Sequence, residues 1–233
     1  MCVLRSLLLV LALPCSAASG QSKGRNIVYI QKDSLLGHKQ SIYYDMDSNS
    51  RGYKLISDFR FKDFDKESYD NSLRYLAEKK ILLRKRTPII PITRWVTLKQ
   101  YKGAFYAYCP CDLYAHFRIS INDTTFINWT GEGPEATKIS DQKKVDDSTY
   151  TFRLSGMYGR NEYMTIYVID TAKGVAVFER SHNGGDDRWL MIAADKIRTV
   201  PLIMNNCEAH KQMELRFETP DHKKLIRNWP KCK

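Results

Sequence analysis

The sequence lacks the short motifs that mark the commonest catalytic sites. It contains no Gly-x-Ser-x-Gly turn, no His-Glu-x-x-His pair and no phosphate-binding glycine loop. It also has no internal repeat and no low-complexity tract. Histidine is scarce and dispersed, at His38, His116, His182, His210 and His222. These absences argue against the familiar hydrolase and nucleotide-binding classes, and we expect a protein without a cofactor.

Long apolar runs are equally scarce. The run from Leu7 to Leu13 has less than half of the roughly 20 residues that a membrane span requires. Arg5 precedes this run, and Pro14 and the small residues 18–20 follow it, which is the layout of a cleaved secretory signal. We therefore expect residues 1–20 to be removed, and we expect no transmembrane segment in the mature chain.

The mature chain, residues 21–233, is predicted to form a single β-rich domain with a C-terminal segment tied by disulfides. It should be extracellular, or periplasmic if the source is bacterial. The full chain has a formal net charge of +11, which becomes +10 once Arg5 leaves with the signal. A chain this basic favours an anionic partner, such as a glycan or a lipid headgroup. Export argues against nucleic acid as that partner.

Short alternating runs rich in aromatic and β-branched residues dominate the mature chain. Examples are "RWVTLKQ" from Arg94 and "EYMTIYVI" from Glu162, and Gly, Asn and Asp turns separate such runs. "YKLIS" from Tyr53 is also interpreted as a strand. About nine strands are predicted, so the fold class is mainly β: an antiparallel barrel or a sandwich. A calycin-like barrel is one form that such a meander can take.

One segment has helical spacing instead. From Lys66 to Arg84, apolar side chains recur three and four residues apart, and Asp65 is a suitable N-cap. The segment predicts one amphipathic helix. Its basic end, from Lys79 to Arg86, suits the negative end of a helix dipole.

Four of the six cysteines follow the predicted signal, at Cys109, Cys111, Cys207 and Cys232. An even number of cysteines in an exported chain favours disulfides. On a strand, Cys109 and Cys111 would point to the same face, so each is expected to bond to Cys207 or Cys232. Which bonds to which is left open by the spacing.

A metal site is the rival interpretation of the same residues. Cys109, Cys111, Cys207 and His210 offer three thiolates and an imidazole, a set that suits zinc or reduced copper. Oxidation competes for these thiols outside the cell, so we favour disulfides and expect no metal.

Two sequons are present, one at Asn122 and one at Asn128. Asn122 follows a predicted strand and is expected to lie in an exposed turn. In a eukaryotic secretory pathway at least Asn122 should carry a glycan, so the chain is predicted to be a glycoprotein if its source is eukaryotic.

Two features keep an enzymatic alternative open. The segment from Ser181 to Trp189 offers Ser181, His182 and acids on a Gly-Gly hinge, so a secreted hydrolase could use this loop. Acid pairs such as Glu132 with Glu135 could cleave glycosides if folding placed two carboxylates about 5–10 Å apart. A hairpin loop is the simpler interpretation of the first feature.

Aromatic residues are abundant on the predicted strands and suggest a ligand surface. We select Tyr106, Tyr108, Tyr114 and Trp129 as candidate ligand-binding residues. The sequence thus favours a secreted, non-enzymatic binding protein for a hydrophobic small molecule or an anionic partner. A matrix or cell-surface structural protein is a further alternative.

Overall fold

The structure is a computed structural model that describes residues 27–35, 37–112, 116–156, 159–182, 185–208 and 214–228. Its dominant feature is a closed antiparallel barrel of eight strands. The barrel strands are β3 (Arg94–Tyr101), β5 (Arg118–Ile121), β6 (Thr125–Thr130), β7 (Gly133–Lys144), β8 (Thr149–Gly156), β9 (Gly159–Asp170), β10 (Val175–His182) and β11 (Gly185–Ala193). The predicted mainly β class is confirmed, in its barrel form.

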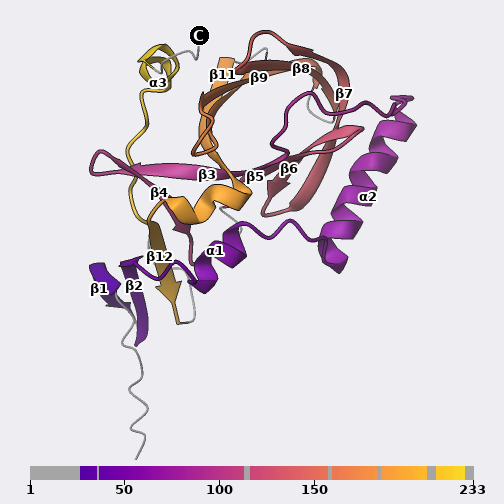
Figure 1. The fold of residues 1–233 in the computed structure, drawn as a ribbon. Coiled ribbons are helices and arrows are strands. Elements are labelled where there is room, and N and C mark those ends of the chain that lie inside the picture. Colours follow the sequence, from indigo (N-terminus) through magenta and orange to yellow (C-terminus); the bar gives the residue numbers. More distant parts are fainter. Residues whose placement is uncertain are drawn as a thin grey trace, which may run out of the picture.

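Strand β3 closes the barrel. Its residue Val96 pairs with Ile192 of β11 on one side and with Arg118 of β5 on the other. Beyond this point β3 leaves the barrel, and Leu98 pairs with Ala107. The same strand therefore belongs both to the barrel and to a sheet that extends from it, as Figure 1 shows.

That extension contains four further strands, in the order β4 (Ala104–Cys109), β12 (Leu202–Cys207), β2 (His38–Asp45) and β1 (Ile27–Leu35). β12 is parallel to β4, and the other neighbours are antiparallel. Four helical elements accompany the strands in the part of the chain that the structure describes, and two of them, the 3₁₀ helix η2 (Ala194–Thr199) and the helix α3 (His222–Asn228), lie toward the C-terminus. Within the described residues, no helix has both the length and the apolarity needed to cross a membrane.

Large side chains fill the barrel interior at the end where β3 begins. Alternate residues of a strand point inward, so each of the eight strands contributes to one core. Ile90, which precedes β3, packs into the same core and closes this end. The largest fully buried members are Trp95, Phe126, Phe152 and Phe178. The interior at this end of the barrel is therefore occupied by large apolar side chains.

The prediction that residues 53–57 form a strand is wrong, because they belong to the helix α1 (Arg51–Ile56). Ser50 caps this helix by accepting a hydrogen bond from the backbone N–H of Gly52. Tyr53 and Ile56, three residues apart, are both buried in the core outside the barrel. A Cβ at Gly52 would lie 2.3 Å from the Met204 sulfur, so a larger residue would require the Met204 and Leu202 side chains of β12 to shift.

The predicted amphipathic helix exists as α2 (Asp63–Glu78), but it begins and ends earlier than expected. Lys62 is its N-cap residue rather than Asp65. At its end, Lys80 adopts φ +57°, and the N–H of Ile81 donates to the carbonyl of Leu76. This closing turn stops the helix, so the basic residues from Lys79 onward lie outside it.

Two strands were missed by the sequence analysis. β7 is rich in charged and polar residues, and β12 precedes residues 208–217, whose composition is compatible with a short helix or strand. In the described part of that segment, residues 214–217 form neither helix nor strand. A strand of unusual composition is stabilised by pairing with its neighbours in the sheet. The local sequence pattern carries no information about those neighbours.

A disulfide joins Cys111, just beyond β4, to Cys207 at the end of β12. Cys109 instead has a free thiol that is 2 % exposed, so its predicted disulfide is not present. β4 ends at Cys109, so Cys111 lies beyond the strand and the expectation that both cysteines share one strand face is wrong. Cys232 lies outside the described residues.

Candidate ligand site at the barrel mouth

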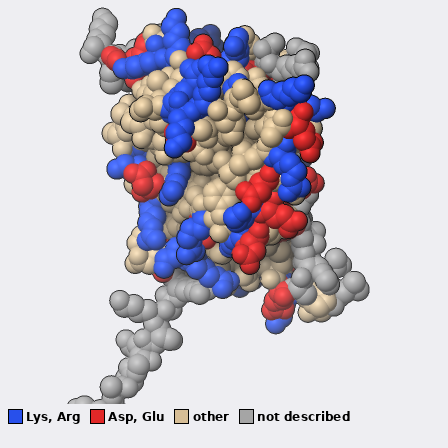
Figure 2. All heavy atoms as spheres, turned by 90° about the vertical axis from the view of Figure 1, so that its right-hand side faces the viewer, with Lys and Arg blue, Asp and Glu red and all other residues tan. Residues whose placement is uncertain are grey.

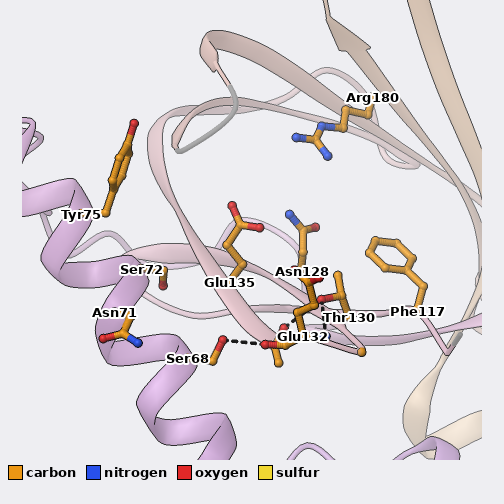
Figure 3. A pocket seen from close by; sticks show the side chains of 12 residues that line it. Ser68, Asn71, Ser72, Tyr75, Phe117, Asn128, Thr130, Glu132, Glu135 and Arg180 are labelled. Atoms are coloured by element: carbon orange, nitrogen blue, oxygen red, sulfur yellow. Dashed lines mark hydrogen bonds between the residues drawn. The ribbon is translucent and has the colours of Figure 1, made fainter. Parts of the chain in front are cut away.

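The other end of the barrel opens into a cavity of about 660 Å³. The turn between β6 and β7 lies here, together with the last residues of β10. Figure 3 shows the lining side chains converging from α2, from this turn and from β10. The lining residues are Ser68, Asn71, Ser72, Tyr75, Phe117, Asn128, Thr130, Gly131, Glu132, Gly133, Glu135 and Arg180. The size falls within the range of about 300–1,000 Å³ that is typical of small-molecule sites.

Helix α2 forms part of the cavity wall. β7 pairs with β8 only from Lys138 onward, so the first residues of β7 project past this neighbour. There the backbone N–H of Ala136 donates to Ser72 Oγ at 2.9 Å, and Ser68 Oγ donates to the carbonyl of Glu132 at 2.9 Å. The helix thus bonds to strand β7 where β8 has ended, and it brings its own polar side chains to the mouth.

Arg180 and Glu162 form an ion pair inside the mouth. Nε of Arg180 donates to Oε2 of Glu162 at 3.0 Å, and Nη2 donates to the same oxygen. The two side chains are only 18 % and 9 % exposed. Because each charge neutralises the other in a place with little water, Arg180 is largely committed to Glu162.

Glu135 is the least satisfied polar group of the cavity. It lies directly opposite Asn128 in the β6–β7 pairing, on the inward face. Its Oε1 is buried, and no hydrogen-bond partner for it exists among the described residues. Burial raises the pKa of this carboxyl, and the nearby Arg180 opposes the rise. Such an oxygen costs free energy until a donor reaches it.

The charged groups and aromatic rings around Glu135 determine which kind of ligand the cavity could hold. Glu132 and Glu135 are the acids that line the cavity, whereas the cation Arg180 is already paired with Glu162. Tyr75 and Phe117 contribute aromatic rings from opposite sides, as Figure 3 shows. Phe117 also packs on Trp189, with ring centroids 5.3 Å apart. The cavity therefore combines excess negative charge with flat apolar surface.

The predicted ligand-binding aromatics lie elsewhere. Tyr106 and Tyr108 belong to β4, outside the barrel, where Tyr108 hydroxyl bonds to Glu214. Trp129 is 2 % exposed and packs outside the barrel under Phe59. Tyr114 lies outside the described residues. The structure thus brings none of the described three into the cavity.

The sequence did contain one signal for the real cavity. Glu132 and Glu135 were noted as an acid pair, and both line the mouth. Arg180 and Phe117 were missed as site residues, because each reaches the cavity only through barrel closure. The inward alternation on β10 could have indicated Arg180, since it lies two residues from the buried Phe178.

The segment from Ser181 to Trp189 forms a hairpin of β10 and β11 around the undescribed residues 183–184. Ser181 Oγ donates to Asp186 at 2.7 Å, and His182 Nε2 lies 3.1 Å from Asp187. Ser181 and His182 follow one another on a strand and so point to opposite faces. These two separate polar pairs do not resemble a nucleophile with its base.

The sequon asparagines have different environments. Asn122 lies in the turn between β5 and β6, as expected, but it is partly buried rather than exposed, and its Oδ1 accepts the N–H of Thr124 at 2.8 Å. Asn128 is 8 % exposed and lines the cavity, so the folded chain does not present it at the surface. Glycosylation at either position stays a prediction.

The alternative metal site has lost two ligands to the Cys111–Cys207 disulfide, and His210 lies outside the described residues. In the part of the chain that the structure describes, no three His, Cys, Asp or Glu residues are grouped as a metal site. Comparisons with protein-family models, curated proteins and solved structures give no match. The inference about function therefore depends on the geometry of the mouth.

Proposed function

We propose that this chain is a non-enzymatic binding protein that holds a small organic cation in the mouth of its barrel. The ligand's nitrogen would donate to Glu135, and its apolar part would lie between Tyr75 and Phe117. The observation that carries the proposal is the buried Oε1 of Glu135 without a partner. An ammonium group supplies the missing donor and also the missing positive charge.

A hydrophobic or an anionic ligand fits this cavity less well. The deep interior is occupied by Trp95, Phe126 and their neighbours. An anion would meet Glu132 and Glu135, and it would have to compete with Glu162 for Arg180. The polar mouth therefore replaces our sequence-based expectation of a hydrophobic ligand with that of a cationic one.

Three probes that share a phenyl ring but differ in charge would test this: 2-phenylethylamine, 2-phenylethanol and 3-phenylpropanoate. Binding is measured by calorimetry, with the fluorescence of Trp189, beside Phe117, as a second signal. We expect the amine to bind most tightly. Preference for the carboxylate would contradict the proposal, and so would the absence of binding by all three probes.

The matched variants are Glu135→Gln in the cavity and Glu67→Gln on the exposed surface of α2. Both remove one negative charge, so long-range electrostatic effects change equally. Loss of a charged hydrogen bond should weaken amine binding about tenfold or more in Glu135→Gln only. Equal weakening in both variants would mean that Glu135 makes no direct contact.

A hydrolytic function is the second candidate. Glu132 and Glu135 line one cavity, and a raised pKa suits a general acid. Nitrophenyl glycosides would test it. Turnover that disappears in both Glu132→Gln and Glu135→Gln would favour the enzyme, whereas amine binding without turnover favours the carrier.

A further inference from the structure

The segment from Lys79 to Arg86, here called the basic strap, crosses the molecule between α2 and the filled end of the barrel. It contains five basic residues and no acidic one. Its first turn is fixed by the bond from Lys80 N–H to the Ala77 carbonyl at 2.9 Å. Its last residue, Arg86, donates its backbone N–H to Asp123 and a guanidinium N–H to the Ser140 carbonyl. The strap is thus held at both ends.

Between these anchors the strap exposes apolar side chains. Leu82 is 70 % exposed and Leu83 is 36 % exposed. Single exposed leucines are ordinary, but two adjacent ones flanked on both sides by cations form an amphipathic surface. Figure 2 shows Lys and Arg side chains along the upper part of this face of the molecule.

The cations of the strap have weak partners or none. Lys85 and Arg86 lie 4.0 Å from Asp123 and Asp141, at the limit for ion pairs. In the described part of the chain, no ion pair engages Lys79, Lys80 or Arg84. Their charges are therefore available to an external partner.

Lys80 provides a second, independent observation. Its φ of +57° lies in the left-handed region, where helices usually end on glycine. A lysine at this position is less stable than glycine would be. The backbone strain at Lys80 lowers stability but adds an exposed positive charge. Strain of this kind is expected where a residue serves binding rather than folding.

We propose that the basic strap docks this protein on an anionic lipid surface, with Leu82 and Leu83 inserted among the headgroups. Cations near an anionic bilayer are attracted to its surface, and adjacent apolar side chains add burial. A sulfated glycan would satisfy the charges but would give the two leucines nothing to contact. This docking is independent of ligand binding at the mouth.

Sedimentation of the exported chain with vesicles tests the proposal. We expect binding to vesicles of phosphatidylcholine with 30 % phosphatidylserine, little binding to pure phosphatidylcholine, and weakening with added salt. The double change Leu82→Ser with Leu83→Ser should weaken binding while preserving its salt dependence. Unchanged binding in this variant would overturn the insertion of the leucines.

Charge variants locate the surface. Lys79→Ser with Arg84→Ser should lower the apparent affinity about thirtyfold. The control, Lys223→Ser with Lys224→Ser on α3, removes the same charge from another exposed site. Equal losses in the two pairs would overturn the proposal. Heparin binding that is insensitive to the leucine changes, without vesicle binding, would show a glycan surface instead.

Lys80→Gly separates function from folding. Because glycine suits the left-handed conformation, this variant should melt at a higher temperature than the parent chain. It should nevertheless bind the anionic vesicles several-fold more weakly, since it lacks one cation. A variant that is more stable and binds equally well would show that Lys80 has no part in docking. Amine binding at the mouth should be unaffected by the leucine changes and by Lys80→Gly, whereas Lys79, whose ammonium lies over the ring of Tyr75, is excluded from this control.

Discussion

Ser72 of α2 accepts the backbone N–H of Ala136 in a hydrogen bond of 2.9 Å, at the place where β7 extends past β8. Ser72 is buried, and its own hydroxyl donates to the carbonyl of Tyr69. One side chain thereby joins the helix to the barrel wall. The polar side chains of α2 reach the mouth because of this junction.

Ser72→Ala should destabilise the protein by about 1–3 kcal/mol, because the N–H of Ala136 would be left buried without an acceptor. Urea unfolding measures the change. Ser68→Ala, which removes a donor on the same helix face at an exposed site, should cost less. Similar costs for the two variants would mean that the Ser72 bond contributes no special stability.

Arg180→Met should cost about 3 kcal/mol, because Glu162 would keep a charge in the mouth without its partner. The double variant Arg180→Met with Glu162→Met removes both charges and should recover much of the lost stability. Thermal unfolding of the three proteins gives the comparison. A double variant less stable than Arg180→Met would show that the unpaired charge of Glu162 is not the cause of the loss.

Amine affinity should fall as the pH is lowered through the pKa of Glu135, which burial raises above its ordinary value. The amine stays protonated throughout, so only the carboxylate changes. Calorimetry between pH 8 and pH 5 measures the trend, and proton uptake by Glu135 in the free protein should appear as proton release on binding. The Glu135→Gln variant should show no such trend; the same trend there would place the titrating group elsewhere.

Stability should fall on acidification because of His116. Burial lowers the pKa of His116 to about 4, and its Nε2 lies 2.9 Å from the Ile56 carbonyl. The folded pKa is below the unfolded value, so the stabilisation is complete above about pH 6.5 and is lost as the pH falls toward 4.

Between pH 7 and pH 5 this residue should lower the free energy of unfolding by about 2 kcal/mol. His116→Gln should flatten the pH dependence over this range. His222, whose pKa burial also lowers, leaves a smaller residual slope. A variant as pH-sensitive as the parent chain would exclude His116 as the source.

Cys109 should resist alkylation in the folded protein. Burial raises the pKa of its thiol to about 11, so little thiolate exists near neutral pH. Peptide mapping after iodoacetamide treatment should label Cys109 only when the chain is unfolded first, and it should recover a disulfide between Cys111 and Cys207. Discovery of Cys109 in a disulfide with Cys232 would contradict the structure.

Short sequence patterns predict much of the architecture, and particular residues show where such patterns fail. The alternation in "EYMTIYVI" identified β9, because Met164 and Ile166 are two residues apart and both face the core. "YKLIS" also combines aromatic and aliphatic residues but belongs to α1, because Gly52 and Tyr53 pack against β12, which is far away in the sequence. Lys80 ends α2 in a conformation that favours glycine, so no sequence rule predicts the stop.

The sequence by itself determined the mainly β class, the approximate helix and the presence of cysteines able to cross-link the C-terminal part. These follow from short-range periodicity and residue type. Only the tertiary structure decided that β3 closes a barrel by pairing with both β11 and β5. The same closure places Arg180 and Glu135 in one cavity, and only the structure shows that Cys109 keeps a free thiol. Pairing between strands that are distant in the sequence determines these features, and a local sequence pattern does not specify which distant strand it will pair with.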